Sequence, residues 1–222
     1  MNHVVRLLVT LFLLVPVLAP AADKPQADEK LSYAIGVLFA RNMALEVDVN
    51  TDQFLAGLRD VLTGAELKYT AEELQQIVTA FQQQQASRQG EAAQGNKAAG
   101  EAFLTANGRK PGVVTLPSGL QYKVVTQGKG AKPAATSTVT VHYRGTLIDG
   151  TEFDSSYKRG EPTTFPLNGV IKGWQEGVGL MTEGSKYELY LPPQLAYGEN
   201  GAGGVIGPNA TLVFEVELLT VK

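Results

Sequence analysis

The side chains of this chain that could do chemistry are mostly aromatic, and they gather in its last third. Three runs hold them: VHYRGTLIDGTEFDSS, VIKGWQEGV and LAYGENGAGGVIGPNATLVFEVELL. Tyr143, Phe153, Trp174, Tyr197 and Phe214 recur across these runs, and no group there could act as a nucleophile held beside a base. A pocket of rings with few titrating groups suits a reaction in which the substrate changes shape and no bond breaks.

Motifs of other enzyme classes are missing from the sequence. There is no G-x-S-x-G, H-E-x-x-H or P-loop, and no cysteine for thiol chemistry or soft-metal binding. Gly201 and Gly203 start a G-x-G, but Ile206 stands where a dinucleotide site needs its third glycine. His142 alternates out of phase with the apolar side of its strand, which predicts a solvated position. We therefore expect no metal and no cofactor.

Rotation about a prolyl amide is a reaction of the kind that such a pocket can catalyse. Resonance holds the amide planar behind a barrier of about 18–20 kcal/mol. The twisted transition state has lost that resonance, so its carbonyl is less charge-separated and a dry site favours it. Lowering the barrier by about 7 kcal/mol would accelerate the rotation about 10⁵-fold.

The three runs resemble the FKBP-type peptidyl-prolyl cis-trans isomerases, over roughly residues 113–222. The resemblance implies that Trp174 is the pocket floor, that the Tyr197 hydroxyl bonds a substrate carbonyl, and that a backbone N–H near Ile171 bonds another. It implies a catalytic set of Tyr143, Phe153, Asp154, Ile171, Trp174, Tyr197 and Phe214. Its substrate-binding set is Arg159, Phe165, Val170, Val205 and Ile206, the last two in a flap over the site. Ordinary core packing is the alternative for each ring, but the ordered set as a whole favours the pocket.

The chain also departs from the small cytosolic members of that family. Thr163 stands where they have a phenylalanine, so one pocket wall is expected to be thinner or open. Ala202 and Gly203 replace a His-Pro pair, which predicts a more mobile flap. Both changes bear on substrate preference more than on activity.

Two short amphipathic helices are predicted in the front half. Apolar residues recur at helical spacing at Leu31, Ile35, Leu38 and Leu45, and again at Phe54, Leu55, Leu58, Val61 and Leu62. Asn50 or Thr51 can cap the second helix, and Gly64 stands where it would end. Because two such helices cannot bury their own apolar faces, a second copy of the chain is the expected partner.

One long helix is predicted from Thr70 to about Ala106, opened by a capping box with Glu73. Its apolar stripe of Leu74, Ile77, Val78 and Phe81 stops at Phe81, so the stretch up to Phe103 is expected to be a solvated spacer. Glycines at 90, 95 and 100 each cost about 1 kcal/mol and mark where it would bend or fray. A disordered Gln-rich linker is the alternative.

From Gly119 the apolar period changes from helical to alternating, as in Val139, Val141 and Tyr143. Asp149-Gly150 is a hairpin signal, and Ile171 to Val178 has helical spacing. The expected fold is α+β: a C-terminal antiparallel sheet wrapped on a short helix, preceded by an all-α module and a long connecting helix.

The front half, in KLSYAIG, VDVNTDQFLAGLRDVLTG and GEAFLTANGRKPGVVTLPSGLQYKV, resembles the macrophage infectivity potentiator subfamily of these isomerases. That resemblance implies a homodimer. The expected parts are a signal peptide (1–21), a helical dimerisation domain (22–69), a linker helix (70–112) and an isomerase domain (113–222). Expected partners are proline-containing unfolded or extended polypeptides and the macrolides tacrolimus and rapamycin. A dimeric holdase-type chaperone, with isomerisation secondary, is the alternative function.

The N-terminus and the charge predict the compartment. Arg6, an apolar run from Leu7 to Leu18, and Ala19-Pro20-Ala21 have the form of a secretory signal peptide, with an uncleaved anchor as the alternative. The expected location is the periplasm or outer-membrane surface of a Gram-negative bacterium. A net charge of −3 without a basic stripe argues against nucleic acid as a partner.

Overall fold

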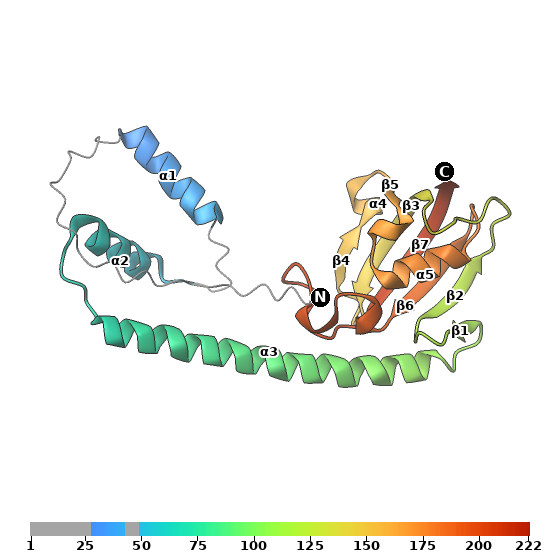
Figure 1. Ribbon diagram of the computed structural model, residues 1–222, viewed down its shortest axis with the longest axis horizontal. Helices are drawn as coiled ribbons and strands as arrows, with labels where there is room; N and C mark the ends of the chain where they lie inside the picture. The colour runs from blue at the N-terminus through green and yellow to red at the C-terminus, as the bar shows by residue number, and fades with distance from the viewer. Residues whose placement is uncertain (1–27, 43–48) are drawn as a thin grey trace. The chain divides into compact units, whose positions relative to one another are not determined.

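The computed structural model describes residues 28–42 and 49–222, and the chain divides into two compact units, Met1–Lys68 and Tyr69–Lys222 (Figure 1). The expected signal peptide and Leu45 lie outside the described residues. Across the ranges that are described, no helix is both long enough and apolar enough to cross a membrane.

The first unit holds the two predicted short helices, α1 (Glu29–Asn42) and α2 (Thr51–Thr63). Asn50 is the N-cap of α2 and accepts a 3.0 Å hydrogen bond from the Gln53 N–H. Gly64 ends the helix in the left-handed conformation, at φ 67°. The apolar side chains remain largely in solvent, including Leu31, Ile35, Leu38, Leu55, Leu58, Val61 and Leu62.

The second unit opens with α3 (Ala71–Asn107), one continuous helix of 37 residues. Its predicted capping box is present: Thr70 N–H donates to Glu73 Oε2 at 2.8 Å, and Glu73 N–H donates to Thr70 Oγ1 at 3.2 Å. The predicted long helix is therefore confirmed, and the alternative of a disordered linker is wrong. The helix also runs unbroken through all three glycines that were expected to bend or fray it.

The expected solvated spacer ends earlier than predicted, because α3 is already in contact with the following domain at Asn96. The Asn96 side-chain amide donates to the Pro208 carbonyl at 2.8 Å. One turn later Gly100 is buried, and a Cβ there would stand 2.3 Å from Thr211 Oγ1. Hydrophobic periodicity does not predict this contact, because Gly100 and the side-chain amide of Asn96 make it and neither is an apolar side chain.

The last turns of α3 continue the contact with the sheet domain. The rings of Phe103 and Tyr190 have centroids 6.0 Å apart. Asn107 is fully buried and donates to Gln121 Oε1 at 3.0 Å, while Gln121 Nε2 donates to the Leu104 carbonyl at 2.8 Å. About three turns of the helix therefore belong to the folded domain.

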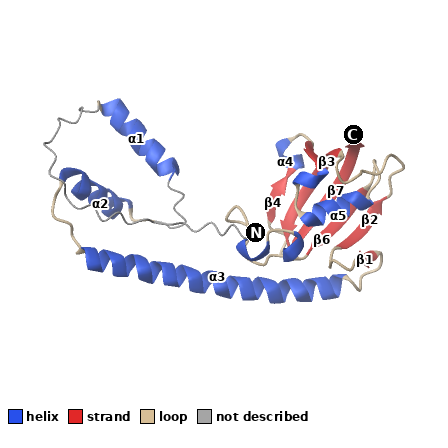
Figure 2. Cartoon of the chain, in the orientation of Figure 1, coloured by secondary structure: helices blue, strands red, loops and turns tan. Residues whose placement is uncertain are grey.

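The rest of the described chain forms a seven-stranded antiparallel sheet in the order β1-β2-β6-β7-β3-β4, with β5 also paired to β3 (Figure 2). The strands are β1 (Val113–Thr115), β2 (Gln121–Thr126), β3 (Thr138–Leu147), β4 (Glu152–Ser155), β5 (Thr163–Pro166), β6 (Lys186–Leu191) and β7 (Leu212–Val221). The short helices are α4 (Ser156–Arg159), α5 (Lys172–Leu180), η1 (Leu167–Gly169), η2 (Pro193–Leu195) and η3 (Gly198–Asn200).

The alternation read from the sequence matches the faces of the sheet. Val139, Val141 and Tyr143 of β3 are buried, as are Leu212, Phe214, Val216 and Leu218 of β7. His142 lies on the opposite face of β3, with its ring stacked on Tyr157 at 4.7 Å between centroids. The predicted α+β fold is therefore confirmed.

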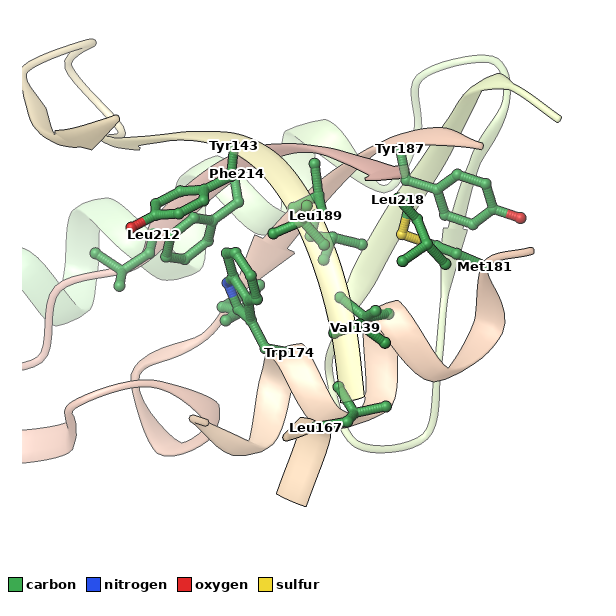
Figure 3. Packing of buried hydrophobic residues seen from close by; sticks show 14 of the residues in the cluster. Val139, Tyr143, Leu167, Trp174, Met181, Tyr187, Leu189, Leu212, Phe214 and Leu218 are labelled. Carbon is green, nitrogen blue, oxygen red and sulfur yellow. The ribbon is translucent and has the colours of Figure 1, made fainter. Parts of the chain in front are cut away.

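Helix α5 lies close against the buried face of the sheet because two glycines face β6. A Cβ on Gly173 would stand 2.4 Å from the Leu191 side chain, and one on Gly177 would stand 2.7 Å from that of Leu189. Larger residues at either position would push the helix outward. Figure 3 shows the result, with Trp174 pointing from α5 toward the rings of Tyr143 and Phe214.

We predict that Gly100→Ala destabilises the sheet domain while Gly95→Ala does not. Thr211 is buried and β-branched, so it has little room to turn away from an added methyl group, and overpacking costs about 1–3 kcal/mol. A Cβ at Gly95 meets open space, so alanine there should gain up to about 1 kcal/mol of helix propensity. Urea unfolding followed by the emission of Trp174 measures both. Equal stabilities of the two variants would contradict the contact.

Candidate active site

A cavity of about 410 Å³ opens between α5, the strands β3 to β5 and the segment before η3. It is lined by Tyr143, Phe153, Asp154, Thr163, Phe165, Gly169, Val170, Ile171, Trp174, Tyr197 and Phe214. The structure thus brings together every residue of the expected catalytic set, with Phe165 and Val170 from the expected substrate-binding set.

Four aromatic rings fix one another around the cavity by edge contacts. Trp174 is only 5% exposed, and its ring centroid lies 5.1 Å from that of Tyr143 and 5.2 Å from that of Phe214, at interplanar angles of 90° and 87°. Phe153 is the fourth ring and lies 5.5 Å from Phe214 at 84°. Phe165 lies 5.5 Å from Trp174 on another side, tilted at 58°. Edge-to-face pairs of this kind are favoured by the ring quadrupoles, so the floor and walls have a defined geometry.

One charged cluster lies at the rim of this apolar cavity. The Asp154 carboxylate accepts hydrogen bonds from the Tyr143 hydroxyl and from Arg159 Nη1. Arg159 Nη2 also donates to the Tyr143 hydroxyl and to Thr163 Oγ1, each at 3.0 Å. Arg159 does not itself line the cavity, but it holds three side chains that do.

Strand pairing in the sheet and the short connections between strands place the residues of this cluster next to one another. Asp154 stands opposite Gly145 in the β3–β4 ladder, two residues beyond Tyr143. Arg159 ends α4, the single helical turn that follows β4, and Thr163 begins β5. Short connections between adjacent strands are therefore enough to bring the four polar groups together.

The cluster shifts the pKa of two groups in opposite directions. Burial by itself would raise the pKa of Asp154, but the hydrogen bonds from Tyr143 and Arg159 together outweigh it and the net pKa is lowered. Burial, and then the hydrogen bond to Asp154, raise the pKa of Tyr143. At neutral pH the cluster therefore holds an ionised carboxylate and a neutral phenol.

The start of α5 supplies backbone donors beside the rings. Ile171 is the N-cap of this helix, so the first N–H groups of the turn have no partner within the helix. Gln175 donates from Nε2 to the Val170 carbonyl at 2.7 Å, which fixes the segment that leads into the helix.

The segment on the far side of the cavity carries Tyr197, whose side chain is 39% exposed. Its hydroxyl makes no hydrogen bond with the part of the chain that the structure describes. The two expected flap residues do not line the cavity: Val205 is 50% exposed, and Ile206 is 8% exposed and packs in the core. Ala202 and Ile206 pair across a tight turn, which directs Ile206 inward.

Two residues that line the cavity, Thr163 and Gly169, are absent from the catalytic and substrate-binding sets expected from the sequence. Thr163 was singled out only as a thinner wall, yet its hydroxyl accepts a hydrogen bond from Arg159. The sequence signal that could have predicted this hydrogen bond is a polar residue at the start of β5, the strand that pairs with the strand of Tyr143. Within the described residues, no group of three or more His, Cys, Asp or Glu side chains could hold a metal ion.

Comparison with known proteins shows the family to which the chain belongs. The FKBP-type peptidyl-prolyl cis-trans isomerase family matches residues 129–219, and the domain amino terminal to FKBP-type peptidyl-prolyl isomerase matches residues 28–124. The chain is 48% identical over 199 residues to the outer membrane protein MIP of Legionella longbeachae, covering 87% of this chain and 85% of that protein. It is 47% identical to the peptidyl-prolyl cis-trans isomerase Mip of Coxiella burnetii, covering 87% and 86%.

Among solved structures, FkpA from Escherichia coli is similar, with a TM-score of 0.64 and 41% identity over 89% of this chain and 98% of that one. The matches extend over the helices as well as the sheet domain. The chain therefore belongs to the FKBP-type peptidyl-prolyl cis-trans isomerases, which isomerise the peptide bond that precedes proline.

Proposed function

We propose that this enzyme accelerates the folding of exported proteins by isomerising Xaa-Pro bonds in the cavity above Trp174. The observation that carries the proposal is the cavity itself, in which four edge-packed rings form the floor and walls, and one charged cluster at the rim is already hydrogen-bonded. Such a site offers an apolar surface for a proline ring. It excludes water from the amide, and the less polar, twisted amide gains from that exclusion.

In this proposal the hydrogen-bonding groups at the rim position the substrate. The Tyr197 hydroxyl and a backbone N–H at the start of α5 bond the carbonyls that flank the proline, and the rings hold an apolar residue before it. Tacrolimus and rapamycin would occupy the same cavity.

Asp154 acts in this scheme by orientation and charge, without transferring a proton. A general base works best with a pKa near the working pH, whereas the pKa of Asp154 is lowered and its carboxylate already accepts two hydrogen bonds. Its bonds hold the Tyr143 ring against Trp174 and keep Arg159 at the rim. Rotation about an amide needs no proton transfer, so this arrangement suits it.

We further propose that residues 22–69 and the start of α3 form a homodimer. The apolar stripe at the start of α3 is exposed, with Leu74, Ile77, Val78 and Phe81 each 38–52% accessible, and the apolar faces of α1 and α2 are exposed as well. Apolar surface of this extent marks an interaction site. A second copy of the chain would bury it and present two cavities to one client. Export is part of the proposal, and it is supported by the leader-like N-terminus and by a relative named as an outer membrane protein.

We predict that Asp154→Ala and Tyr197→Phe each lower peptide turnover about 2- to 10-fold while the fold survives. Asp154→Ala removes the acceptor of the Tyr143 and Arg159 hydrogen bonds, and Tyr197→Phe removes the hydroxyl proposed to bond a substrate carbonyl. Tacrolimus and rapamycin should compete with the peptide and change the emission of Trp174, the only tryptophan. A proline-limited refolding assay on the chain from Ala22 measures turnover. If a folded sample shows the same peptide turnover and the same Trp174 emission with and without either drug, the proposed site is refuted.

We predict that Asp154→Asn weakens the acid sensitivity of the fold. Because the pKa of Asp154 is lower in the folded state, its ionised form adds stability above the unfolded-state value of about 3.9, and this is lost as pH falls through the folded value. The wild type should therefore lose more stability than Asp154→Asn between about pH 5 and pH 3. Urea unfolding at several pH values measures this, and Tyr143→Phe, which removes one of the two hydrogen bonds, should give an intermediate slope. Identical slopes in all three proteins would contradict the pKa assignment.

We predict that Ile77→Glu and Phe81→Glu make the mature chain monomeric at micromolar concentration, because a charge in an apolar interface lacks a partner. Gln83→Glu, a change at an exposed polar position on the opposite face of the same helix, is the control and should leave the dimer intact. Sedimentation velocity measures the mass, and turnover on short peptides should not change. Refolding of a protein client should slow in the monomers. A monomeric wild type would exclude the homodimer.

A further inference from the structure

The loop between Tyr197 and Asn209, here called the flap loop, connects the cavity to helix α3. At its first residue Tyr197 lines the cavity, and near its end Pro208 accepts the 2.8 Å hydrogen bond from Asn96 Nδ2. Gly207 lies so close to Asn96 that a Cβ on it would stand 2.9 Å from the same nitrogen. A polar side chain of α3 is thus packed against one end of a loop whose other end carries a ring that lines the cavity.

The backbone of the flap loop is held together by few bonds of its own. Asn209 N–H donates to the Gly198 carbonyl at 2.8 Å, which closes the base of the loop, and Ala202 and Ile206 exchange two backbone bonds of 2.8 and 3.0 Å nearer its tip. Gly201, between these two sets of bonds, and Gly203 and Gly204, at the tip of the loop, adopt positive φ. Glycines lose more conformational freedom on folding than other residues, so a loop rich in them depends on each external contact for its position.

We propose that Asn96 is a positioning residue for catalysis. Its amide holds the Pro208 carbonyl, the Asn209–Gly198 bond passes this constraint to the start of the loop, and Tyr197 is thereby fixed over the cavity. The inference rests on the proposed role of the Tyr197 hydroxyl toward a substrate carbonyl. It gives α3 a part in the active site in addition to its part as a connection.

The burial of Gly100 explains why Asn96 can reach the loop. One turn after Asn96, the absence of a side chain at Gly100 lets α3 approach Thr211, which follows the flap loop by two residues. The helix therefore contacts the loop at one turn and the residue shortly after the loop at the next turn. One of these contacts is steric and the other is a hydrogen bond with a defined direction.

The test compares Asn96→Ala with Gln94→Ala in the full mature chain. Both remove an amide from α3, but Gln94 is exposed and serves as the control. Asn96→Ala should raise KM for a short proline peptide about 2- to 10-fold, the effect of one hydrogen bond, with a smaller change in kcat. Asn96→Asp, which keeps the size and cannot donate, should behave like Asn96→Ala. The amides of Ala202 and Ile206 should exchange with solvent faster in both Asn96 variants than in Gln94→Ala.

A double-mutant cycle with Tyr197→Phe separates this inference from the proposed function. If Asn96 acts through Tyr197, the rise in KM caused by Asn96→Ala should largely disappear in the Tyr197→Phe background. Additive effects, or an Asn96→Ala variant with wild-type KM beside an impaired Tyr197→Phe, would overturn the role of Asn96. A silent Tyr197→Phe would instead reject the proposed role of the hydroxyl.

Discussion

The close approach of α5 to the sheet is the constraint on which the rest of the structure depends. Trp174 is a core residue and the floor of the cavity at once, so the depth of the cavity is set by how near the helix lies. Gly173 and Gly177 allow that distance, and Tyr143 and Phe214 of the sheet fix the indole plane by their edges. The core and the cavity therefore share the same contacts, and a change that loosens the core also changes the proposed site.

The rim cluster explains how a cavity with a carboxylate can remain apolar. An isolated charge would keep its water, whereas Asp154 has Tyr143 and Arg159 as partners. Thr163 takes a further hydrogen bond from the guanidinium, so a polar residue at this wall is accommodated by the same cluster. These hydrogen bonds reduce the free energy needed to remove water from the Asp154 carboxylate when a substrate binds.

The parts of the fold that follow a repeating pattern could be predicted from the sequence. Alternation gave β3, β6 and β7, capping residues gave the starts of α2 and α3, and the family motifs gave the set of residues around Trp174. The contact between α3 and the sheet domain could not be predicted in this way, because Asn96 and Gly100 carry no apolar signal. The inward direction of Ile206 could not be predicted either, since a tight turn decides which way its side chain points and a turn has no periodicity.

The docking of one end of α3 has a mechanical consequence. From Asn96 back to Ala71 the helix extends about 37 Å beyond its attachment, without a break at its glycines. A rotation of the sheet domain by about 10° would displace the far end of this lever by about 6 Å. In the proposed function, a client chain that pulls on the cavity would apply torque to the helix. The length of α3 before Asn96 determines how far each degree of rotation carries its other end.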